Sequence, residues 1–266
     1  MTLSVVIPAY QEASTIEATV SSVHHMWRIR GEIAEIVVVD DGSTDGTGDV
    51  VDGLRLPGVR VLRQENRGKG AALQAGVVTS TGEQLYFIDA DLPYAPKDQL
   101  RVVDTLRAGA PVAVGSRRAP GSSASTYPFT RRLSSACLGR LVKVTLGVAS
   151  SDTQCGLKGF DGALARRLFP VLRIPGFGFD LEIFALLAAW RIPVVECPVH
   201  LTHRRASTVQ QTRDVPRILK DLKETRRRLR EGRYTLGEHP TPPVRLPAAG
   251  GHPELAGRAY QRQGTT

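Results

Sequence analysis

The chain is poor in cysteine and has no long hydrophobic run. Its three cysteines, Cys137, Cys155 and Cys197, lack C-x-x-C spacing, so we expect free thiols in a reducing compartment, with no disulfide and no zinc site. The longest apolar run beside a predicted helix covers residues 183–190, whereas a membrane-spanning helix needs about 20 residues. We therefore expect no segment that crosses a membrane.

Other sequence signatures are also missing. A predicted strand begins directly after Met1 and Thr2, which leaves no room for an export signal, so we expect a cytoplasmic protein. Aromatic residues make up only 6% of the chain and are not interleaved with basic ones, which argues against nucleic-acid binding. Neither G-x-x-x-x-G-K-[ST] nor a G-x-G-x-x-G after the first strand occurs, which excludes two common phosphate-binding loops.

The composition suits one sizeable domain with a positive charge. The chain has 266 residues, of which 41% are hydrophobic, and this is ample for a buried core. The net charge of +9 and the sequence pI of about 9.9 favour an anionic partner, such as a nucleotide or a phospholipid headgroup. We expect one folded domain over residues 1–236 and a disordered tail over residues 237–266, where Pro and Gly dominate.

Short β-branched runs alternate with helical spacing in the first half of the chain. Strands are predicted at residues 3–8, 35–40, 59–64, 85–88 and 111–115, and helices at residues 13–27, 44–54, 69–78 and 97–108. This alternation predicts an α/β fold with a Rossmann-like, doubly wound, mostly parallel sheet and helices on both faces. The second half predicts a loop at 118–130, helices at 131–146 and 179–190, and strands at 157–160 and 194–198.

Residues 213–233 combine positive charge with an apolar stripe. They contain nine Lys or Arg and four Asp or Glu, and the stripe consists of Val215, Ile218, Leu219, Leu222 and Leu229. Two interpretations remain open. The segment is either a basic amphipathic helix on an anionic membrane surface, or a solvated helix that packs its stripe on the domain.

Two carboxylates follow the predicted strand at residues 85–88. Asp89 and Asp91 are separated by Ala90, and an extended chain would place both on the same side. Because burying two like charges is costly without a cation, the pair predicts a hard divalent ion that also binds substrate phosphates. The alternative is a turn or helix cap before Pro93.

The three preceding strands also end in polar or glycine motifs: Pro8-Ala9-Tyr10-Gln11-Glu12, Asp40-Asp41-Gly42-Ser43 and Asn66-Arg67-Gly68-Lys69-Gly70. Tyr10 and Glu12 suit a nucleoside, and either aspartate of the second motif could accept an N–H from a base. The glycines of the third motif let a helix N-terminus and Lys69 approach phosphate. Each motif alone could be helix capping, but the four together indicate a nucleotide-diphosphate site at the carboxyl edge of the sheet.

The order PAYQE, VVDDGSTDGT, ENRGKGAAL and DAD resembles family 2 glycosyltransferases of the GT-A fold, over about residues 3–222. The resemblance implies a nucleotide-sugar donor, UDP- or GDP-linked, on residues 1–115. The implied donor-binding residues are Pro8, Ala9, Tyr10, Glu12, Asp41, Lys69, Asp89, Ala90 and Asp91. Asp89 and Asp91 would hold Mg²⁺ or Mn²⁺ against the diphosphate.

Later motifs look like the polyprenyl-phosphate branch of this family, the dolichyl-phosphate glucosyltransferases and mannose synthases. They are GSR at 115–117, RRLSS at 131–135, DTQCGLK at 152–158 and GFDLE at 178–182. The similarity implies an acceptor-binding half over residues 116–212, with Arg117, Arg131 and Ser135 on the lipid phosphate. Residues 203–208 resemble the late loop of the family, in which Arg204 would close over the donor diphosphate.

Two positions depart from the family pattern. Ala206 and Thr208 flank Ser207 where the family often has Gly-x-Ser-Lys, and Pro93 stands where mannose synthases often have Gln. These departures favour a transferase other than a strict mannose synthase. We expect a cytoplasmic enzyme, peripheral on the inner face of the membrane if the basic helix of residues 213–236 binds lipid.

The expected reaction is a single displacement with inversion, in which an acceptor phosphate oxygen attacks the anomeric carbon of the sugar. A phosphate monoester has a second pKa near about 6, so it is already an anion and needs no strong base. For an alcohol acceptor, Asp152, Asp180 or the predicted catalytic residue Glu182 would be the base, with Gln154 beside the sugar. Two alternatives remain: the same donor chemistry on a soluble acceptor, and a sugar nucleotidyltransferase, although PAYQE lacks the glycine-rich loop that the latter would need.

Overall fold

The structure, a computed structural model, describes residues 1–32, 34–91, 94–122, 152–176, 178–200 and 211–234. The strands are β1 (Leu3–Ala9), β2 (Ala34–Asp40), β3 (Val59–Arg63), β4 (Gln84–Phe87), β5 (Val112–Ser116), β6 (Lys158–Asp161) and β7 (Val195–Pro198). The helices are α1 (Ile16–Ile29), α2 (Thr47–Gly53), α3 (Lys69–Thr79), α4 (Pro96–Arg107), α6 (Gly162–Leu168), the 3₁₀ turn η1 (Phe169–Val171), α7 (Phe179–Ala189) and α8 (Gln211–Arg230).

These strands form one sheet in the order β3-β2-β1-β4-β6-β5-β7. Strands β1 to β4 pair in parallel, as do β5 and β7, and the predicted mostly parallel α/β sheet is confirmed. The prediction did not include the reversal at β6, which runs antiparallel to both β4 and β5. Through this reversal, the segment that precedes β6 lies beside the end of β4.

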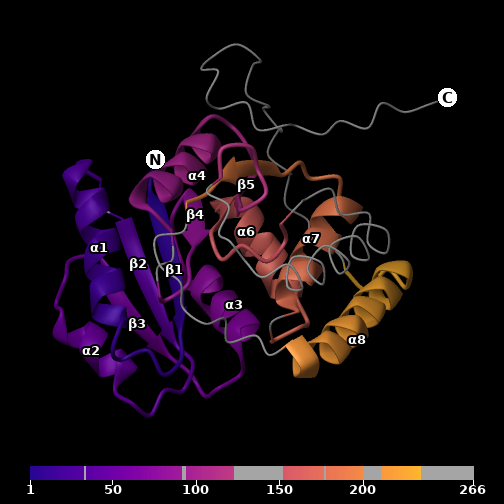
Figure 1. Cartoon of the computed structure of the whole chain (residues 1–266), viewed down its shortest axis with the longest axis horizontal. Coiled ribbons are helices and arrows are strands. Elements are labelled where there is room, and N and C mark those ends of the chain that lie inside the picture. The colour runs from indigo at the N-terminus through magenta and orange to yellow at the C-terminus, as the bar shows by residue number, and fades with distance from the viewer. Residues whose placement is uncertain (33, 92–93, 123–151, 177, 201–210, 235–266) are drawn as a thin grey trace.

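The sheet carries helices on both faces (Figure 1). Successive residues of a strand point to opposite faces, so Val5 and Val6 of β1 belong to different parts of the core. Val5 packs in the layer formed with α1, α2 and α4, whereas Val6 packs in the layer formed with α3, α6 and α7. Burial on both faces explains why the parallel strands read as continuous apolar runs.

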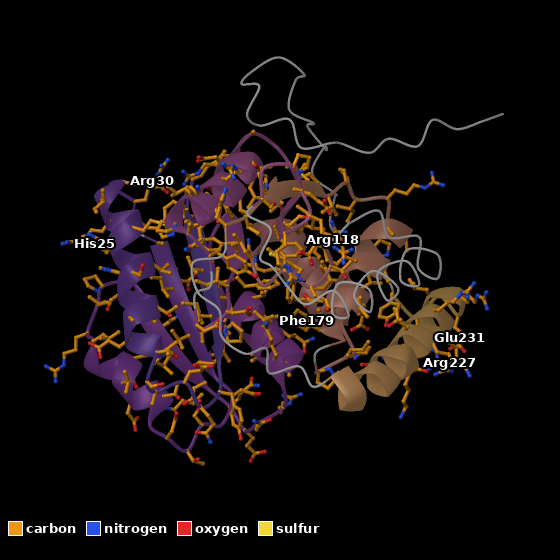
Figure 2. The ribbon with its side chains drawn as sticks, in the orientation of Figure 1. His25, Arg30, Arg118, Phe179, Arg227 and Glu231 are labelled. Atoms are coloured by element: carbon orange, nitrogen blue, oxygen red, sulfur yellow. The ribbon has the colours of Figure 1, made fainter. Side chains whose placement is uncertain are left out.

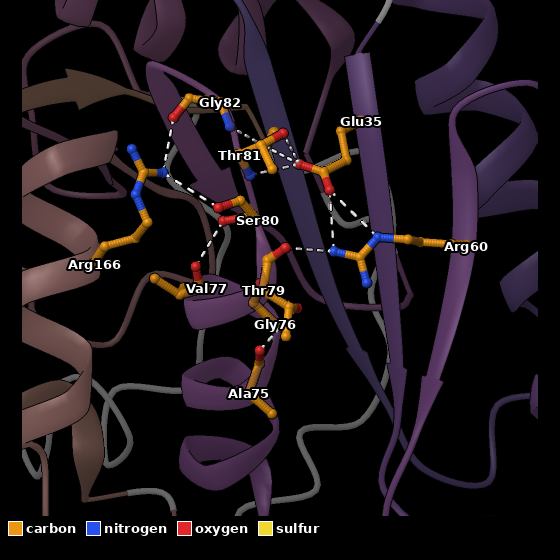
Figure 3. Close-up of polar contacts among 11 residues, drawn as sticks. Glu35, Arg60, Ala75, Gly76, Val77, Thr79, Ser80, Thr81, Gly82 and Arg166 are labelled. Carbon is orange, nitrogen blue, oxygen red and sulfur yellow. Dashed lines mark hydrogen bonds and ion pairs between the residues drawn. The ribbon is translucent and has the colours of Figure 1, made fainter.

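A polar network stabilises the edge of the sheet that lies opposite the carboxyl ends of the parallel strands. Glu35 of β2 accepts hydrogen bonds from Arg60 Nη2 at 3.0 Å and from the amide of Thr81 at 2.9 Å. Arg166 of α6 donates to the carbonyl of Gly82 at 3.0 Å (Figure 3). The network therefore ties β2, β3, the α3–β4 connection and α6 together and leaves the opposite edge for the site.

The predicted elements of the first half are confirmed with small shifts at their ends. Helix α2 begins at Thr47 rather than residue 44, because Gly46 has a φ of 86°, in the left-handed region. Helix α6 was not predicted, although Asp161 caps it by accepting from the amide of Leu164 at 2.9 Å. The predicted helix at 131–146 and the predicted tail at 237–266 lie outside the described residues.

Two leucines of the apolar stripe of α8 pack inside the protein. Leu222 is 3% exposed and belongs to the core layer that contains α7, and Leu229 packs against the same layer. Arg227 and Glu231 lie on the outer side of the helix (Figure 2) and form an ion pair at 3.1 Å. Leu222 and Leu229 therefore favour the interpretation of a helix packed on the domain, while the side chains of Val215, Ile218 and Leu219 lie outside the described residues. No helix in the described ranges has the length and apolar character to cross a bilayer.

Candidate active site

The carboxyl ends of β1, β2 and β4 meet at one edge of the sheet, as predicted. Ala9 at the end of β1 pairs with Asp40 at the end of β2, and Val6 pairs with Phe87 at the end of β4. Because these strands are parallel, the motifs that follow them gather at one place.

The chain does not remain extended through the two predicted metal-binding aspartates. Strand β4 ends at Phe87, and Ala90 and Asp91 form a turn, so the argument from an extended chain was wrong. Thr19 of α1 donates a hydrogen bond to the carbonyl of Ala90 at 2.5 Å and anchors this turn. The turn, rather than strand periodicity, sets how Asp89 and Asp91 face the site.

Lys69, the first residue of α3, forms an ion pair with Asp89. Burial opposes ionisation of Asp89, but neighbouring cations, Lys69 first among them, hold the pKa of this carboxyl below its usual value. Burial would lower the pKa of the lysine, yet three carboxylates, Asp89, Asp180 and Asp91, raise it. Both predicted metal-site aspartates therefore act on the same ammonium group, as expected if they lie around one small space.

Carboxylate oxygens such as those of Asp89 and Asp91 are ligands that a hard divalent cation such as Mg²⁺ or Mn²⁺ prefers, and a metal at this pair stays a prediction. The described residues hold no cluster of three or more His, Cys, Asp or Glu side chains that could bind a metal. One or two carboxylates together with substrate phosphates are the usual way in which proteins bind Mg²⁺, and Asp89 and Asp91 would supply those carboxylates.

The segment before β6 lies directly against Asp89. A Cβ atom on Gly156 would overlap the carboxylate of Asp89, with only 2.6 Å to Cγ. The amide of Gly156 donates to the hydroxyl of Tyr94 at 2.7 Å, which fixes the backbone in this position. The glycine is needed for close approach between the two halves of the chain, a role that the sequence motif alone did not reveal.

Replacing Gly156 by Ala is expected to push the Asp89 carboxylate aside and to lower kcat/KM roughly ten- to a hundredfold, since a displacement of about 1 Å can cost that much. Gly53→Ala is the matched control, because nothing lies within 4 Å of a Cβ at that position. Steady-state kinetics of both variants would test the contact. Equal activity in the two would contradict it.

Arg117, at the end of β5, is held by Asp152. Its Nε and Nη2 donate to the two oxygens of Asp152 at 2.7 and 2.8 Å, and its own amide donates to the same carboxylate at 3.0 Å. Burial opposes ionisation of Asp152, but this pairing holds the pKa of the carboxyl below its usual value. Asp152 is thereby engaged in orienting an arginine, and the geometry does not favour the predicted alternative of a general base.

Asp180 and Glu182, at the start of α7, have separate tasks. Asp180 pairs with the fully buried Lys158 at 2.6 Å, although burial still raises the pKa of this carboxyl. Glu182 is also fully buried and accepts from the amides of Arg173 and Ile174 at 2.9–3.0 Å. These bonds engage the carboxylate within the fold, and the geometry does not favour Glu182 as a base, so its catalytic role stays a prediction.

The predicted nucleoside-binding residues lie at the ends of β1 and β2. Tyr10 is half exposed, beyond Pro8 and Ala9. Asp41 is buried and accepts from the amides of Arg67 and Gly68 at 2.9 and 2.8 Å, so it orders the loop that leads into Lys69. Recognition of a base by Asp41 stays a prediction, whereas the structure shows that Asp41 orders the loop before Lys69.

The DGSTDGT sequence has a structural role that its residue pattern did not predict. The amide of Gln11 donates to Ser43 Oγ at 3.0 Å, and the amide of Glu12 donates to Thr47 Oγ1 at 2.9 Å. Asp45 accepts from the amide of Ala13 at 3.0 Å. These bonds tie the loop after β1, including the predicted donor residue Glu12, to the loop after β2.

Several predicted residues lie elsewhere. Arg131, Ser135 and Arg204 fall outside the described residues, and Gln154 lies in the described turn that follows Asp152. Lys158 and Tyr94 belong to the site without having been predicted. Lys158 could have been noticed as the last residue of the DTQCGLK motif, but Tyr94 carries no comparable signal.

The glycosyl transferase family 2 model matches residues 4–169. The chain is 30% identical over 239 residues to a dolichyl-phosphate beta-glucosyltransferase of Dictyostelium discoideum, which covers 81% of this chain and 73% of the relative. It is 31% identical over 213 residues to a polyprenol monophosphomannose synthase of Mycolicibacterium smegmatis, with 75% and 77% covered. The predicted resemblance to the polyprenyl-phosphate branch is thus confirmed at the level of relatives.

Solved structures show the same fold. Mannosyl-3-phosphoglycerate synthase from Rubrobacter xylanophilus has a TM-score of 0.65 at 22% identity, covering 92% of this chain and 79% of that one. Glucosyl-3-phosphoglycerate synthase from Mycobacterium tuberculosis, in complex with Mn²⁺, UDP and glucosyl-3-phosphoglycerate, has a TM-score of 0.62 at 21% identity, covering 84% and 79%. The predicted GT-A fold is confirmed, and because the family model spans more than half of the residues, the chain belongs to glycosyl transferase family 2.

Proposed function

We propose that this glycosyltransferase moves a hexosyl group from a nucleoside-diphosphate sugar to a polyprenyl phosphate, with inversion at the anomeric carbon. The observation that carries the proposal is the meeting of Asp89, Lys69 and Arg117 at the carboxyl edge of the sheet, where acidic and basic groups suit two phosphate-bearing substrates. Asp89 pairs with Lys69, and the charge of Arg117 also acts on Asp89. Relatives in the polyprenyl-phosphate branch support the same acceptor class.

On the donor side, residues 1–115 would hold the nucleotide sugar. Tyr10 and Glu12 lie at the end of β1 for the nucleoside, and Lys69 stands at the N-terminus of α3, where its ammonium group and the positive end of the helix dipole both favour an anion. A divalent cation on Asp89 and Asp91 would add positive charge against the diphosphate, as a Lewis acid does for a leaving group. Arg204 remains predicted to close over the same group.

On the acceptor side, Arg117 is the described residue that best suits the phosphate. An arginine has five N–H donors, so the edge bound to Asp152 leaves other donors for a phosphate. The pairing also fixes the guanidinium plane before substrate arrives, which lowers the cost of ordering it on binding. Arg131 and Ser135 remain predicted partners of the same phosphate.

The proposed reaction does not need a strong general base. The acceptor phosphate is already an anion at neutral pH, so one of its oxygens can attack the anomeric carbon while the bond to the donor phosphate breaks. The task of the chain is to align the two substrates and to oppose the charge that develops on the leaving diphosphate. Lys69 provides a fixed cation for this purpose.

The acceptor lipid would reach the protein at a membrane, and the outer side of α8 offers charge for that approach. Lys220, Lys223, Arg226, Arg227 and Arg230 are exposed on this helix. Attraction of such a surface to anionic lipids is worth about 1 kcal/mol per basic residue near the membrane and is screened by salt. We propose a peripheral association driven by charge.

The test is transfer of labelled sugar from UDP-glucose or GDP-mannose, with Mn²⁺, to a short polyprenyl phosphate. Label should enter the organic phase with the phosphorylated lipid and not with the same polyprenol lacking phosphate. Arg117→Lys keeps the charge but loses the two-pronged contact, and it should raise the KM for the acceptor roughly tenfold and leave the KM for the donor unchanged. Label found only on a water-soluble acceptor would instead establish the alternative acceptor class.

A further inference from the structure

Helix α3 begins at Lys69 and has no side-chain cap. Gly68 precedes the helix and provides no capping side chain. The first amides of a helix need partners from outside it, and here the carbonyl of Pro175 accepts from the amides of Gly70 and Ala71 at 2.7 and 3.2 Å. The loop that contains Pro175 therefore fixes the start of α3.

The fit between this loop and the helix is tight. A Cβ atom on Gly68 would come within 2.7 Å of the Pro175 carbonyl oxygen, and one on Gly70 would come within 2.6 Å of the Ile174 carbonyl oxygen. A shift of the loop over residues 173–175 must therefore move the first turn of α3. Since Lys69 forms its ion pair from this turn, the loop position is transmitted to Asp89.

The loop is itself held by one buried carboxylate. Glu182 accepts from the amides of Arg173 and Ile174, at 3.0 and 2.9 Å. It also accepts the hydroxyl hydrogen of Tyr234, a residue just beyond α8 that is 8% exposed. A charged acceptor with no solvent contact depends on such donors, because an unsatisfied buried charge is costly.

Helix α8 meets α7 at a second point nearby. A Cβ atom on Gly178, directly before α7, would collide with the side chain of Asp221 on α8. Phe179, the first residue of α7, lies against α3, since a Cβ atom on Gly70 would come within 2.8 Å of Phe179 Cβ, and the centroid of its ring lies 6.0 Å from Lys69 Nζ. Docking of α8 and of Tyr234 thus fixes both the loop at 173–175 and the start of α7.

We infer that Tyr234 and Glu182 are positioning residues of the donor site: through the loop at 173–175 they set the first turn of α3 and the place of Lys69 beside Asp89. The inference deepens the proposed function and rests on it for the identity of the donor. It also assigns Glu182 a use different from that of a general base, since the carboxylate touches backbone amides and a tyrosine hydroxyl, not the reacting groups.

The first experiment measures the link without any substrate. Tyr234→Phe removes only the hydroxyl and keeps the buried ring, and Glu182→Gln keeps the shape but removes the charge. Amide hydrogen exchange at Gly70 and Ala71 should become roughly three- to tenfold faster in both variants, the size expected for one lost hydrogen bond. Lys223→Gln, an exposed change on α8, is the control and should leave these rates unchanged. Unchanged exchange in Tyr234→Phe and Glu182→Gln would overturn the inference.

The second experiment measures donor binding by titration calorimetry, with UDP and with GDP, each in the presence of Mn²⁺. Whichever nucleotide binds the wild type should bind Tyr234→Phe and Glu182→Gln roughly three- to tenfold more weakly. The KM for the donor should rise similarly, with kcat and the KM for the acceptor within about twofold. The double variant should show less than the sum of the two effects, because both residues act through one chain of contacts.

The outcomes separate the two ideas. Faster exchange with unchanged nucleotide affinity would mean a purely structural role and overturn the inference, and so would a fall in kcat at unchanged donor KM. If the wild type binds neither nucleotide, the proposed function fails, while the exchange rates at Gly70 and Ala71 still decide whether Tyr234 and Glu182 hold the start of α3.

Discussion

Replacing Asp91 by Ala should lower kcat/KM for sugar transfer about 10²- to 10³-fold, a loss of about 3–4 kcal/mol in transition-state stabilisation. Asp91 is one of two carboxylates that would hold a divalent cation against the leaving diphosphate, and it acts on Lys69 in the same small space. Without it, positive charge is lost where the transition state gains negative charge. The rate should be measured at saturating acceptor over a range of Mn²⁺ concentrations.

Binding of Mn²⁺ provides a readout separate from turnover. Electron paramagnetic resonance should show weaker binding of the ion by Asp91→Ala in the presence of UDP or GDP. Asp104→Ala is the matched control, since Asp104 lies on α4 with 46% of its side chain exposed and forms a long, 3.8 Å ion pair with Arg30. If Asp91→Ala kept the turnover and the Mn²⁺ affinity of the wild type, Asp91 would not be a metal ligand and the proposed site would lose its central residue.

The candidate site could be predicted from the sequence because its polar and glycine motifs come directly after the predicted strands. Strands β1 to β4 are apolar and β-branched, since both faces of a parallel sheet are buried, and their carboxyl ends must meet. Strand ends therefore predict that Lys69, Asp89 and Asp91 lie at the same edge of the sheet. They do not predict the ion pair of Lys69 with Asp89, because β2 and β1 separate β3 from β4 in the sheet.

What could not be predicted depends on partners distant in sequence. Strand β6 has the sequence KGFD, which has no alternation of apolar and polar residues, so its insertion between β4 and β5 has no local signal. Asp152 reads as a turn residue until Arg117, which comes 35 positions earlier, is placed beside it. Glu182 reads as a charge in the first turn of a helix, and its partner Tyr234 lies 52 positions away.

Lys158→Met should destabilise the protein by about 3–5 kcal/mol at neutral pH, the cost of leaving one partner of a buried ion pair alone. Lys158 is fully buried, donates to Asp180 at 2.6 Å and to the carbonyl of Cys155 at 2.5 Å, and lies over the rings of Phe87 and Phe184. Methionine preserves much of the packing but not the charge. Urea unfolding of the variant and the wild type would give the difference.

The way in which the stability loss of Lys158→Met depends on pH and on its partner Asp180 distinguishes the effect of the lost charge from that of lost packing. Burial raises the pKa of Asp180 even with Lys158 present, and removing the lysine must raise it further. An acid whose pKa is higher in the folded than in the unfolded state destabilises the fold at pH values above the folded pKa. That cost disappears as the pH falls through the folded pKa toward the unfolded one, so the deficit of Lys158→Met should shrink on acidification.

Adding Asp180→Asn should recover most of the stability at neutral pH, because a neutral pair removes the uncompensated charge. A deficit that is independent of pH and persists in the double variant would show that Lys158 contributes by packing alone. The pair lies beside Lys69 and Asp89, where Asp180 acts on the ammonium group and Lys158 on the carboxylate. The same buried charges that make this region sensitive to substitution therefore hold the donor-side lysine and aspartate in their ionised forms.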